Sequence, residues 1–488
     1  MKKYSLINNV LGWVVFLIAT TVYLLTAEPT VPWWDCGEYT ATADKLQVGH
    51  PPGAPTFQLI GSLFSIFAGS DTSLVAYAMN AMSAICSGFT ILFLFWTITM
   101  LAKKLVKNKE EMTLGQMIAI FASGVVGSLA YTFSDTFWYS AVESEVYAMS
   151  SCFTAISFWA ILKWEAEADD KHNLRWLILI AFLIGISIGV HLLNLLAIPA
   201  ITYVFYFKKY PNVEKNKKRN FILVGIISML LVAIILYFIV PYIVIFAGKF
   251  EIFFTNSIGL PFNTGTIVYF ALLIGLLVWG VWYSIKKQKV ILNTALLSVL
   301  FILIGYTTFF VLVIRSNANT PINENAPKDA TALLTYLNRE QYGYTPLFHG
   351  QYYNAMVVDQ QESSSKYIKD KESGKYIEVK QRGKLVYESD KTTIFPRMWS
   401  NDESRNHPTY YKMWAGIDEN SDRKPTFAEN LTYFFRYQVN HMYWRYFMWN
   451  FAGRQNDIQS HGLNLSGNEP TNVSNGTKDL LHGNWITG

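Results

Sequence analysis

LRWLILIAFLIGISIGVHLLNLLAIPAITYVFYF, residues 174–207, holds a single charged side chain in an apolar and aromatic run. About 20 helical residues cross a hydrocarbon core roughly 30 Å thick, so this run is too long for one crossing. Gly189 and Pro199 provide points at which a helix can bend. The run therefore predicts two successive membrane-spanning helices, near 174–190 and 192–207.

Similar apolar runs recur before residue 315. The chain has 488 residues, of which 51% are hydrophobic and 15% charged, and its mean hydropathy is +0.21. A soluble protein carries about 25% charged residues. We expect nine spans, near 10–26, 73–101, 115–133, 146–164, 174–190, 192–207, 220–246, 265–285 and 290–314. The predicted fold is mostly α, a polytopic transmembrane helical bundle.

The loops between these spans sort their charges by side. With the N-terminus inside, almost every Lys and Arg before residue 315 falls in an inner loop, and the outer loops hold only Lys45 and Lys249. Basic residues mark the cytoplasmic side. We therefore predict a multi-pass protein of the cytoplasmic membrane whose working face is extracytoplasmic. The net charge of +5 reflects this anchoring, and no nucleic-acid partner is expected.

The composition divides the chain near residue 315. Residues 1–315 form the expected transmembrane module, and residues 316–488 a polar, mixed α/β extracytoplasmic region. Residues 375–389 alternate and predict a hairpin that turns at Gly383. The ending at 482–488 is neither helix-like nor a polar tail, which suggests that the chain is a truncated part of a longer protein. Interfacial helices are expected at 56–68, 247–264 and 431–451.

The first outer loop carries the strongest group of candidate catalytic residues. Trp33-Trp34-Asp35-Cys36-Gly37-Glu38 is followed by His50-Pro-Pro-Gly. A carboxylate beside aromatic rings can have its pKa raised into the range of a general base. The twin prolines would hold His50 in a rigid turn. The alternative is a solvated loop with interfacial tryptophans.

Four further outer-face residues are candidates for substrate binding. Glu143 and Glu145 form a Glu-x-Glu pair that could bind a sugar or a divalent cation, or simply begin a helix. We expect no metal and no other cofactor there. Arg315 ends the ninth span, where it could bind a lipid phosphate or snorkel to the interface. Arg445 is a further candidate for the same phosphate.

Two polar residues interrupt the long apolar run. His191 and Asn194 lie three residues apart, on one face of a helix. Polar groups at this depth are costly unless they face a cavity or another helix. They predict either a substrate contact or a hydrogen bond between helices.

The residues of the first outer loop resemble those of a known enzyme group. Asp35-x-x-Glu38 followed by His50-Pro-Pro-Gly is similar to the Asp-Glu and His-Pro-Pro pattern of protein O-mannosyltransferases, within the GT-C superfamily of glycosyltransferases that use polyprenyl-phosphate sugars. The chain most resembles multipass O-mannosyltransferase-like proteins formerly catalogued as a domain of unknown function. Here, two residues separate the acids, and Gly replaces Leu-Gly-Lys after the prolines. The similarity continues in order through 34–55, 141–147, 189–199, 259–265, 338–350 and 441–457.

The resemblance implies a reaction and its participants. Asp35 would act as the catalytic base on a Ser or Thr hydroxyl of an exported protein, and Glu38 would hold the sugar or the acceptor. The donor would be a polyprenyl-phosphate hexose such as mannose, held at the membrane lipid, and transfer would invert the anomeric carbon. Glu143 and Glu145 resemble the superfamily's second acidic motif. A further possibility is an enzyme of the same fold that glycosylates a lipid or a glycan.

A transporter or lipid flippase is the competing class. Transporters place ionisable groups near the bilayer midplane and are often built from repeated halves. In this chain the acids lie in outer loops and no repeat is visible. The sequence therefore favours a membrane glycosyltransferase.

Overall fold

The computed structural model describes residues 2–107, 111–210, 216–343, 345–361, 365–380 and 383–453. The chain separates into two compact units. The first comprises Met1–Phe133, Phe137–Glu340 and Ile368–Ile377. The second comprises Ser134–Thr136, Gln341–Tyr367 and Glu378–Gly488. The C-terminal residues that suggested a truncated chain, 482–488, lie outside the described residues.

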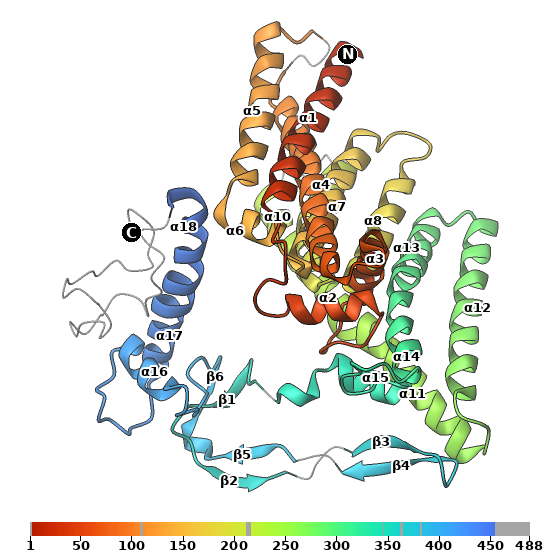
Figure 1. Cartoon of the computed structure of the whole chain (residues 1–488), viewed down its shortest axis with the longest axis vertical. Helices are drawn as coiled ribbons and strands as arrows, with labels where there is room; N and C mark the ends of the chain where they lie inside the picture. Colours follow the sequence, from red (N-terminus) through yellow and green to blue (C-terminus); the bar gives the residue numbers. More distant parts are fainter. Residues whose placement is uncertain are drawn as a thin grey trace. The chain divides into compact units, whose positions relative to one another are not determined.

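The first unit is helical (Figure 1). Its α-helices are α1 (Lys2–Thr26), α2 (Cys36–Asp44), α3 (Pro55–Ser65), α4 (Val75–Lys104), α5 (Leu114–Thr132), α6 (Asp135–Ala141), which begins at the boundary, α7 (Val146–Ala166), α8 (Leu174–Ile188), α9 (Ala197–Lys209), α10 (Lys217–Ile234), α11 (Val240–Ile252), α12 (Thr264–Lys286), α13 (Val290–Tyr306), α14 (Phe310–Asn317) and α15 (Ala330–Leu337). Short 3₁₀ or π turns link several of them: η1 (Ile66–Ala68), η2 (Thr72–Leu74), η3 (Leu192–Leu196), η5 (Ile235–Ile239), η6 (Phe253–Ser257) and η7 (Thr307–Phe309).

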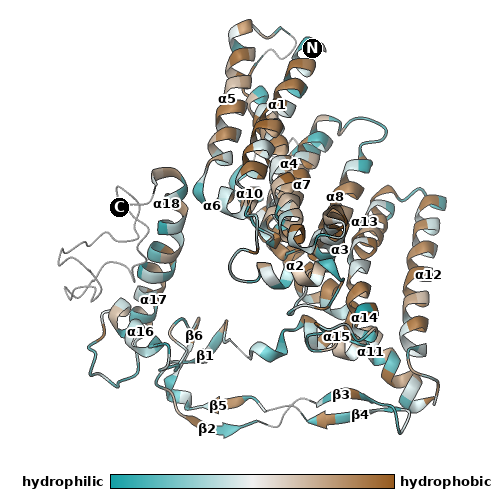
Figure 2. Ribbon diagram, in the orientation of Figure 1, coloured by the Kyte–Doolittle hydropathy of each residue, from teal (hydrophilic) through white to brown (hydrophobic). Residues whose placement is uncertain are grey.

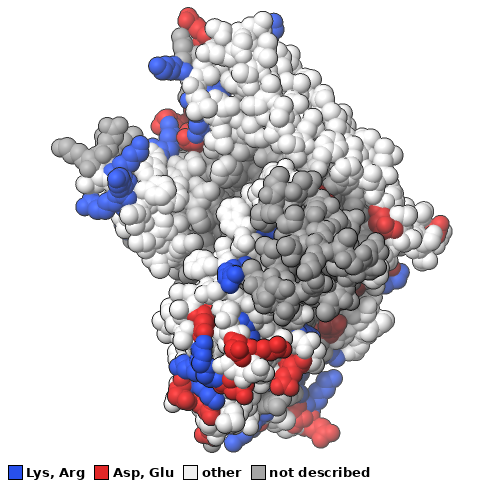
Figure 3. Space-filling model, turned by 90° about the vertical axis from the view of Figure 1, so that its left-hand side faces the viewer, with Lys and Arg blue, Asp and Glu red and all other residues white. Residues whose placement is uncertain are grey.

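Seven helices in the described part of the chain are long and apolar enough to cross a membrane. They are Lys3–Thr26, Thr72–Lys104, Leu114–Thr132, Val146–Ala166, Lys217–Ser257, Thr264–Lys286 and Val290–Asn317. Figure 2 shows hydrophobic residues along these helices, and Figure 3 shows that the surface around α5 is largely free of charged side chains below its upper end. The chain is therefore a mostly α, multi-pass membrane protein.

The fifth and sixth predicted spans differ from the other seven. They form α8, of 15 residues, and α9, of 13 residues, joined by η3. Such lengths are short for a full crossing. Both ends of this helical hairpin carry basic residues, so the sidedness of the other spans is the same whether the two helices cross fully or turn back.

Close contact between backbones fixes α8 beside α13. A Cβ atom added at Gly185 would lie 2.3 Å from the carbonyl oxygen of Ile302, and one added at Gly305 would lie 2.3 Å from the nitrogen of Ile186. Small residues let membrane helices approach in this way. The polypeptide between α8 and α9 is thereby brought to the end of the unit where α3 lies.

The basic residues gather at one end of the first unit. Figure 1 places the N-terminus, the α7–α8 connection and the α12–α13 connection at the upper ends of their helices, while α2, α3 and α15 lie at the lower end. At the upper end, Lys163 and Arg175 both pair with Glu167, at 3.0 and 2.7 Å. The acidic loops and the basic loops thus lie at opposite ends of this unit.

The structure shows what two of the three segments expected as interfacial helices are. Residues 247–264 are not a separate element, because the long helix continues through the π turn η6 to Ser257. The segment 56–68 is an apolar helix that begins with buried residues, whereas its end exposes Ile66 and Phe67.

The second unit contains short strands and helices rich in aromatic residues. The hairpin of β3 and β4 is described with it, although residues Ile368–Ile377 of that hairpin belong to the first unit. The elements are η8 (Glu340–Tyr342), β1 (His349–Gln351), β2 (Val357–Gln360), β3 (Ser365–Asp370), β4 (Lys375–Lys380), β5 (Leu385–Tyr387), η9 (Ser389–Lys391), β6 (Thr392–Ile394), α16 (His407–Ala415), α17 (Phe427–Tyr433), η10 (Phe434–Trp444) and α18 (Arg445–Ala452). The strands pair two by two, β1 with β6, β2 with β5 and β3 with β4.

The predicted hairpin over 375–389 is wrong in its pairing. Its two halves, β4 and β5, pair with β3 and β2 rather than with each other. The turn that makes a hairpin lies at 371–374, where Gly374 has φ +69°. A left-handed residue in a short loop favours a tight reversal, which accounts for the choice of turn.

Candidate active site

The first predicted outer loop, which lies between α1 and α4, brings two acids and a histidine into contact. Asp35 directly precedes α2, and Glu38 lies in its first turn. The Glu38 carboxylate accepts a hydrogen bond from the backbone nitrogen of His50 at 2.5 Å, and its other oxygen lies 3.1 Å from His50 Nδ1. On the other side of the ring, His50 Nε2 lies 4.0 Å from Asp35 Oδ2. The imidazole is therefore placed between two carboxylates.

The Glu38–His50 contact changes the acidity of both groups. Hydrogen bonding to Glu38 raises the pKa of His50 above its usual value, with help from the charges of Asp35 and Glu324 and against the effect of burial. Burial alone would raise the pKa of Glu38, but the hydrogen bonds from His50 outweigh it and lower that pKa. The pair thus favours a carboxylate and an imidazolium. Asp35 is more accessible, with its side chain 59% exposed.

Glycine is required beside this pair. A Cβ atom at Gly49 would lie 2.5 Å from Glu38 Oε1, so any side chain there would push the carboxylate away. Gly53 has φ +73°, and its Cβ atom would lie 2.8 Å from the hydroxyl oxygen of Tyr336. The His50 loop, which we define as residues 46–53, is therefore closely packed on two sides.

The second acidic loop lies against the same helix. Glu143 and Glu145 are 8% and 9% exposed, and the Ser144 hydroxyl between them lies 3.2 Å from that of Thr40 in α2. Burial, together with the charge of Glu145, raises the pKa of Glu143 to about 7. Burial also raises the pKa of Glu145.

Glu145 interacts electrostatically with residues of the first acidic loop and also caps a helix. The charges of Asp35 and His50 both act on it, which links the two acidic loops electrostatically. Glu145 also caps α7 by accepting a hydrogen bond from the nitrogen of Val146 at 3.1 Å. The helix start considered as an alternative role is therefore present, alongside the proximity to the first loop.

The two polar residues of the long apolar run have different surroundings. The His191 ring lies 5.4 Å from the ring of Tyr147, which follows Glu145 by two residues. Asn194 is fully buried and donates hydrogen bonds to Ser187 at 3.0 Å and Ser157 at 3.4 Å. Asn194 thus makes the hydrogen bond between helices that was considered as the alternative, and only His191 reaches the second acidic loop.

Arg315 holds the first outer loop in place. Its Nε donates to the carbonyl oxygen of Leu46 at 2.5 Å, and its Nη2 donates to that of Lys45 at 3.1 Å. A guanidinium has five N–H donors, so these contacts leave capacity for a phosphate. Binding of a lipid phosphate by Arg315 stays a prediction.

Residues 316–336 complete the site, and sequence reasoning missed them. Val48 and Asn323 form a β-bridge, and the nitrogen of Glu324 donates to the carbonyl oxygen of Val48 at 3.0 Å. Tyr336 donates to the carbonyl oxygens of Gly49 and His50. Within the sequence of this segment, only Asp329 gives a recognisable signal, that of a residue that caps a helix.

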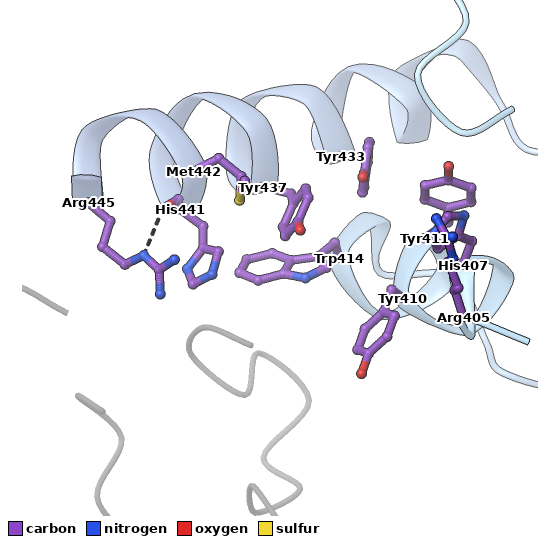
Figure 4. Close-up of a pocket in the computed structure, with 10 residues that line it drawn as sticks. All are labelled: Arg405, His407, Tyr410, Tyr411, Trp414, Tyr433, Tyr437, His441, Met442 and Arg445. Atoms are coloured by element: carbon purple, nitrogen blue, oxygen red, sulfur yellow. Dashed lines mark hydrogen bonds between the residues drawn. The ribbon is translucent and has the colours of Figure 1, made fainter. Parts of the chain in front are cut away.

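Arg445 belongs to the second unit. It lines a cavity of about 410 Å³ there, together with Trp414, Tyr437 and His441 (Figure 4). Its Nε donates to the carbonyl oxygen of His441 at 3.0 Å. The position of this cavity concerns the second unit alone, and its role in donor binding stays a prediction.

The described residues contain no group of three or more His, Cys, Asp or Glu side chains that could hold a metal ion. The segment after α1 places two carboxylates beside an imidazole. An exposed carboxylate beside a cationic ring suits the removal of a proton from a hydroxyl near a bound anion.

Comparisons with known proteins found two family models that match parts of the chain. Residues 35–214 match the family model of the protein O-mannosyl-transferase TMEM260 N-terminal domain. Residues 343–435 match a family of unknown function (DUF8416). The first match covers both acidic loops and the turn at His191.

Two curated proteins have similar segments. The protein O-mannosyl-transferase tmem260 of Dictyostelium discoideum is 28% identical over 156 residues, which is 32% of this chain and 17% of that protein. The protein O-mannosyl-transferase TMEM260 of Mus musculus is 25% identical over 175 residues, which is 36% of this chain and 22% of that protein. The chain thus matches less than a quarter of either relative's length, and no solved structure shows a significant match. Through residues 35–214, the chain is similar to proteins of the protein O-mannosyl-transferase TMEM260 family.

Proposed function

We propose that the protein is a membrane glycosyltransferase of the GT-C type that moves a sugar, mannose or another hexose, from a polyprenyl-phosphate donor to Ser or Thr hydroxyls of exported proteins. The curated relatives named protein O-mannosyl-transferase support the reaction class. The apolar helices suit a donor held in the bilayer.

One observation carries the proposal: the exposed carboxylate of Asp35 lies 4.0 Å from an imidazole that Glu38 holds by its ring and its backbone. A general base must be accessible to its substrate and fixed in position. Asp35 is accessible, and the His50 loop beside it is fixed.

The proposed reaction transfers the sugar in one displacement. Asp35 takes the proton of the acceptor hydroxyl while its oxygen forms a bond to the anomeric carbon. The bond from that carbon to the phosphate oxygen breaks, and the electron pair leaves with the polyprenyl phosphate. Attack opposite the leaving group inverts the anomeric centre, as in inverting glycosidases.

The other residues would bind the donor and the acceptor. The raised pKa of His50 keeps its ring cationic to higher pH, which suits contact with the donor phosphate. Glu143, Glu145 and His191 would line the sugar side, and Arg315 would contact the donor phosphate. Arg445, in the second unit, stays a separate candidate for binding phosphate. Asn194 would support the turn at His191 through its bonds to Ser157 and Ser187.

The proposed working face is extracytoplasmic. The acidic loops lie at the end of the first unit opposite the basic loops, and basic loops stay in the cytoplasm. An acceptor on an exported protein would meet Asp35 at this face.

The test is transfer from polyprenyl-phosphate mannose to a Ser/Thr peptide by the purified full chain. Asp35→Asn keeps the shape of the side chain and removes the base. Glu28→Gln is the matched control, because Glu28 is an exposed carboxylate of the same outer loop. We expect loss of at least about 100-fold in turnover for Asp35→Asn, the lower range for removing a general base, and little change for the control.

Transfer by Asp35→Asn at the wild-type rate would overturn the assignment of the base. Absence of transfer by the wild-type protein, with lipid or glycan acceptors glycosylated instead, would overturn the protein acceptor. Movement of the intact donor across the membrane without transfer would favour a flippase.

A further inference from the structure

Trp34 combines two features that are unfavourable for folding. Its backbone has φ +64°, in the left-handed region. Glycine adopts this region freely, whereas a bulky residue there is strained. Its side chain is also 88% exposed, so burial of the indole ring does not offset that strain.

Other large residues with positive φ have structural partners. The carbonyl oxygen of Leu46 accepts a hydrogen bond from Arg315, and the ring of Phe395 packs on that of Phe434. Among the described residues, the structure gives the Trp34 ring no aromatic or hydrogen-bonding partner. Strain that persists without compensation within the fold points to a functional constraint.

The position of Trp34 suggests which constraint applies. It directly precedes Asp35, whose carboxylate lies 4.0 Å from the His50 ring. A left-handed residue at this point sets the path of the chain into α2, and its exposed indole belongs to the residue that directly precedes the candidate base in the chain. We propose that Trp34 is a binding platform for the pyranose ring of the donor, whose C–H face would pack on the indole.

This inference rests on the proposed function and deepens it, because it names the part of the donor that Trp34 recognises. The alternative occupant of an exposed tryptophan at a membrane boundary is the lipid interface itself. Trp33 distinguishes the two. It is 81% exposed and adjacent in sequence, and its backbone is not left-handed. An interfacial anchor would use both rings equally.

The experiment compares Trp34→Gly, Trp34→Phe and Trp33→Ala in the full chain. Donor binding is measured with polyprenyl-phosphate mannose in nanodiscs without acceptor, and the KM and kcat of transfer are measured with a Ser/Thr peptide. Polyprenyl phosphate without sugar serves as a second ligand. Thermal unfolding of each variant reports folding.

We expect Trp34→Gly to weaken donor binding and raise the donor KM by about threefold to tenfold, the loss of one aromatic contact. Its unfolding temperature should be unchanged or higher, because glycine relieves the strain. Trp34→Phe should retain most of the affinity, and Trp33→Ala should bind like wild type. Affinity for polyprenyl phosphate without sugar should not change.

Several results would overturn the inference. Equal losses in Trp33→Ala and Trp34→Gly would indicate a lipid anchor. A loss that is as large for polyprenyl phosphate without sugar would assign the ring to the isoprenoid. Marked destabilisation of Trp34→Gly would show a structural role. If wild type binds the donor but transfers nothing, the proposed function fails while the binding data still decide the role of Trp34. If wild type neither binds nor transfers, both fall.

Discussion

The Tyr336 hydroxyl donates to the carbonyl oxygen of Gly49 at 2.6 Å, although 287 residues separate them in the chain. Tyr336 is fully buried in α15, and the same hydroxyl lies 3.1 Å from the carbonyl oxygen of His50. A residue that follows the last long apolar helix thus holds the loop that follows the first.

Tyr336→Phe removes this contact and keeps the ring. We expect a loss of about 1 kcal/mol in the free energy of unfolding, typical of one buried hydrogen bond, and a lower kcat because His50 is less well held. Unfolding in mixed detergent measures the change in stability, and the transfer assay measures the change in kcat. Tyr306→Phe is the control, since that buried hydroxyl only approaches Val240, at 3.5 Å. Identical behaviour of the two variants would remove the special role of Tyr336.

The Glu38–His50 pair predicts how stability depends on pH. The lowered pKa of Glu38 stabilises the fold above pH 4.5, its usual value, and this is lost as pH falls through the folded-state pKa. The raised pKa of His50 stabilises the fold fully below pH 6.5 and is lost as pH rises through the folded-state pKa. The contribution of the pair is therefore largest between these values.

Glu38→Gln tests this dependence. The difference in unfolding temperature between wild type and variant should be greatest near pH 5.5, between the two usual values, and should shrink on either side. Asp44→Asn is a control at an acid of the same helix, paired at 2.9 Å with Lys45. A difference that is constant from pH 4 to pH 9 would contradict the coupling.

Glu143 predicts a further loss of stability as pH rises. Its pKa is raised from 4.5 to about 7, so ionisation of this buried carboxyl destabilises the fold as pH rises through that value. Glu143→Gln should match wild type below pH 4.5 and be more stable at pH 8, by at most about 3 kcal/mol. Thermal unfolding at the two pH values measures the difference. A variant less stable than wild type at pH 8 would show that the carboxylate is needed in its charged form.

Labelling tests the sidedness of the loops. Lys45→Cys lies in the first outer loop and Lys171→Cys between α7 and α8, and both positions are exposed. An impermeant maleimide should label the first in intact cells and the second only after permeabilisation. The native cysteines Cys36, Cys86 and Cys152 are replaced by Ser or Ala in the background. Labelling of Lys171→Cys in intact cells would invert the topology and remove Asp35 from the outer face.

The sequence by itself determined the membrane character of the chain and the composition of its first outer loop. Backbone groups in lipid are satisfied within helices, so length and hydropathy predicted nine spans, and seven of the described helices are long and apolar enough to cross a membrane. The proximity of Asp35, Glu38 and His50 was also predictable, because they lie close together in the sequence, within residues 35–50.

Only the tertiary structure decided how that loop is held and which distant residues join it. The contacts of Arg315 with Leu46, of Glu324 with Val48 and of Tyr336 with Gly49 connect segments that no local pattern relates. The burial that raises the pKa of Glu143 likewise comes from packing of the second loop on α2. Hydropathy and spacing act along the chain, whereas these interactions arise from helices packed side by side, and their partners are known only once the helices have assembled.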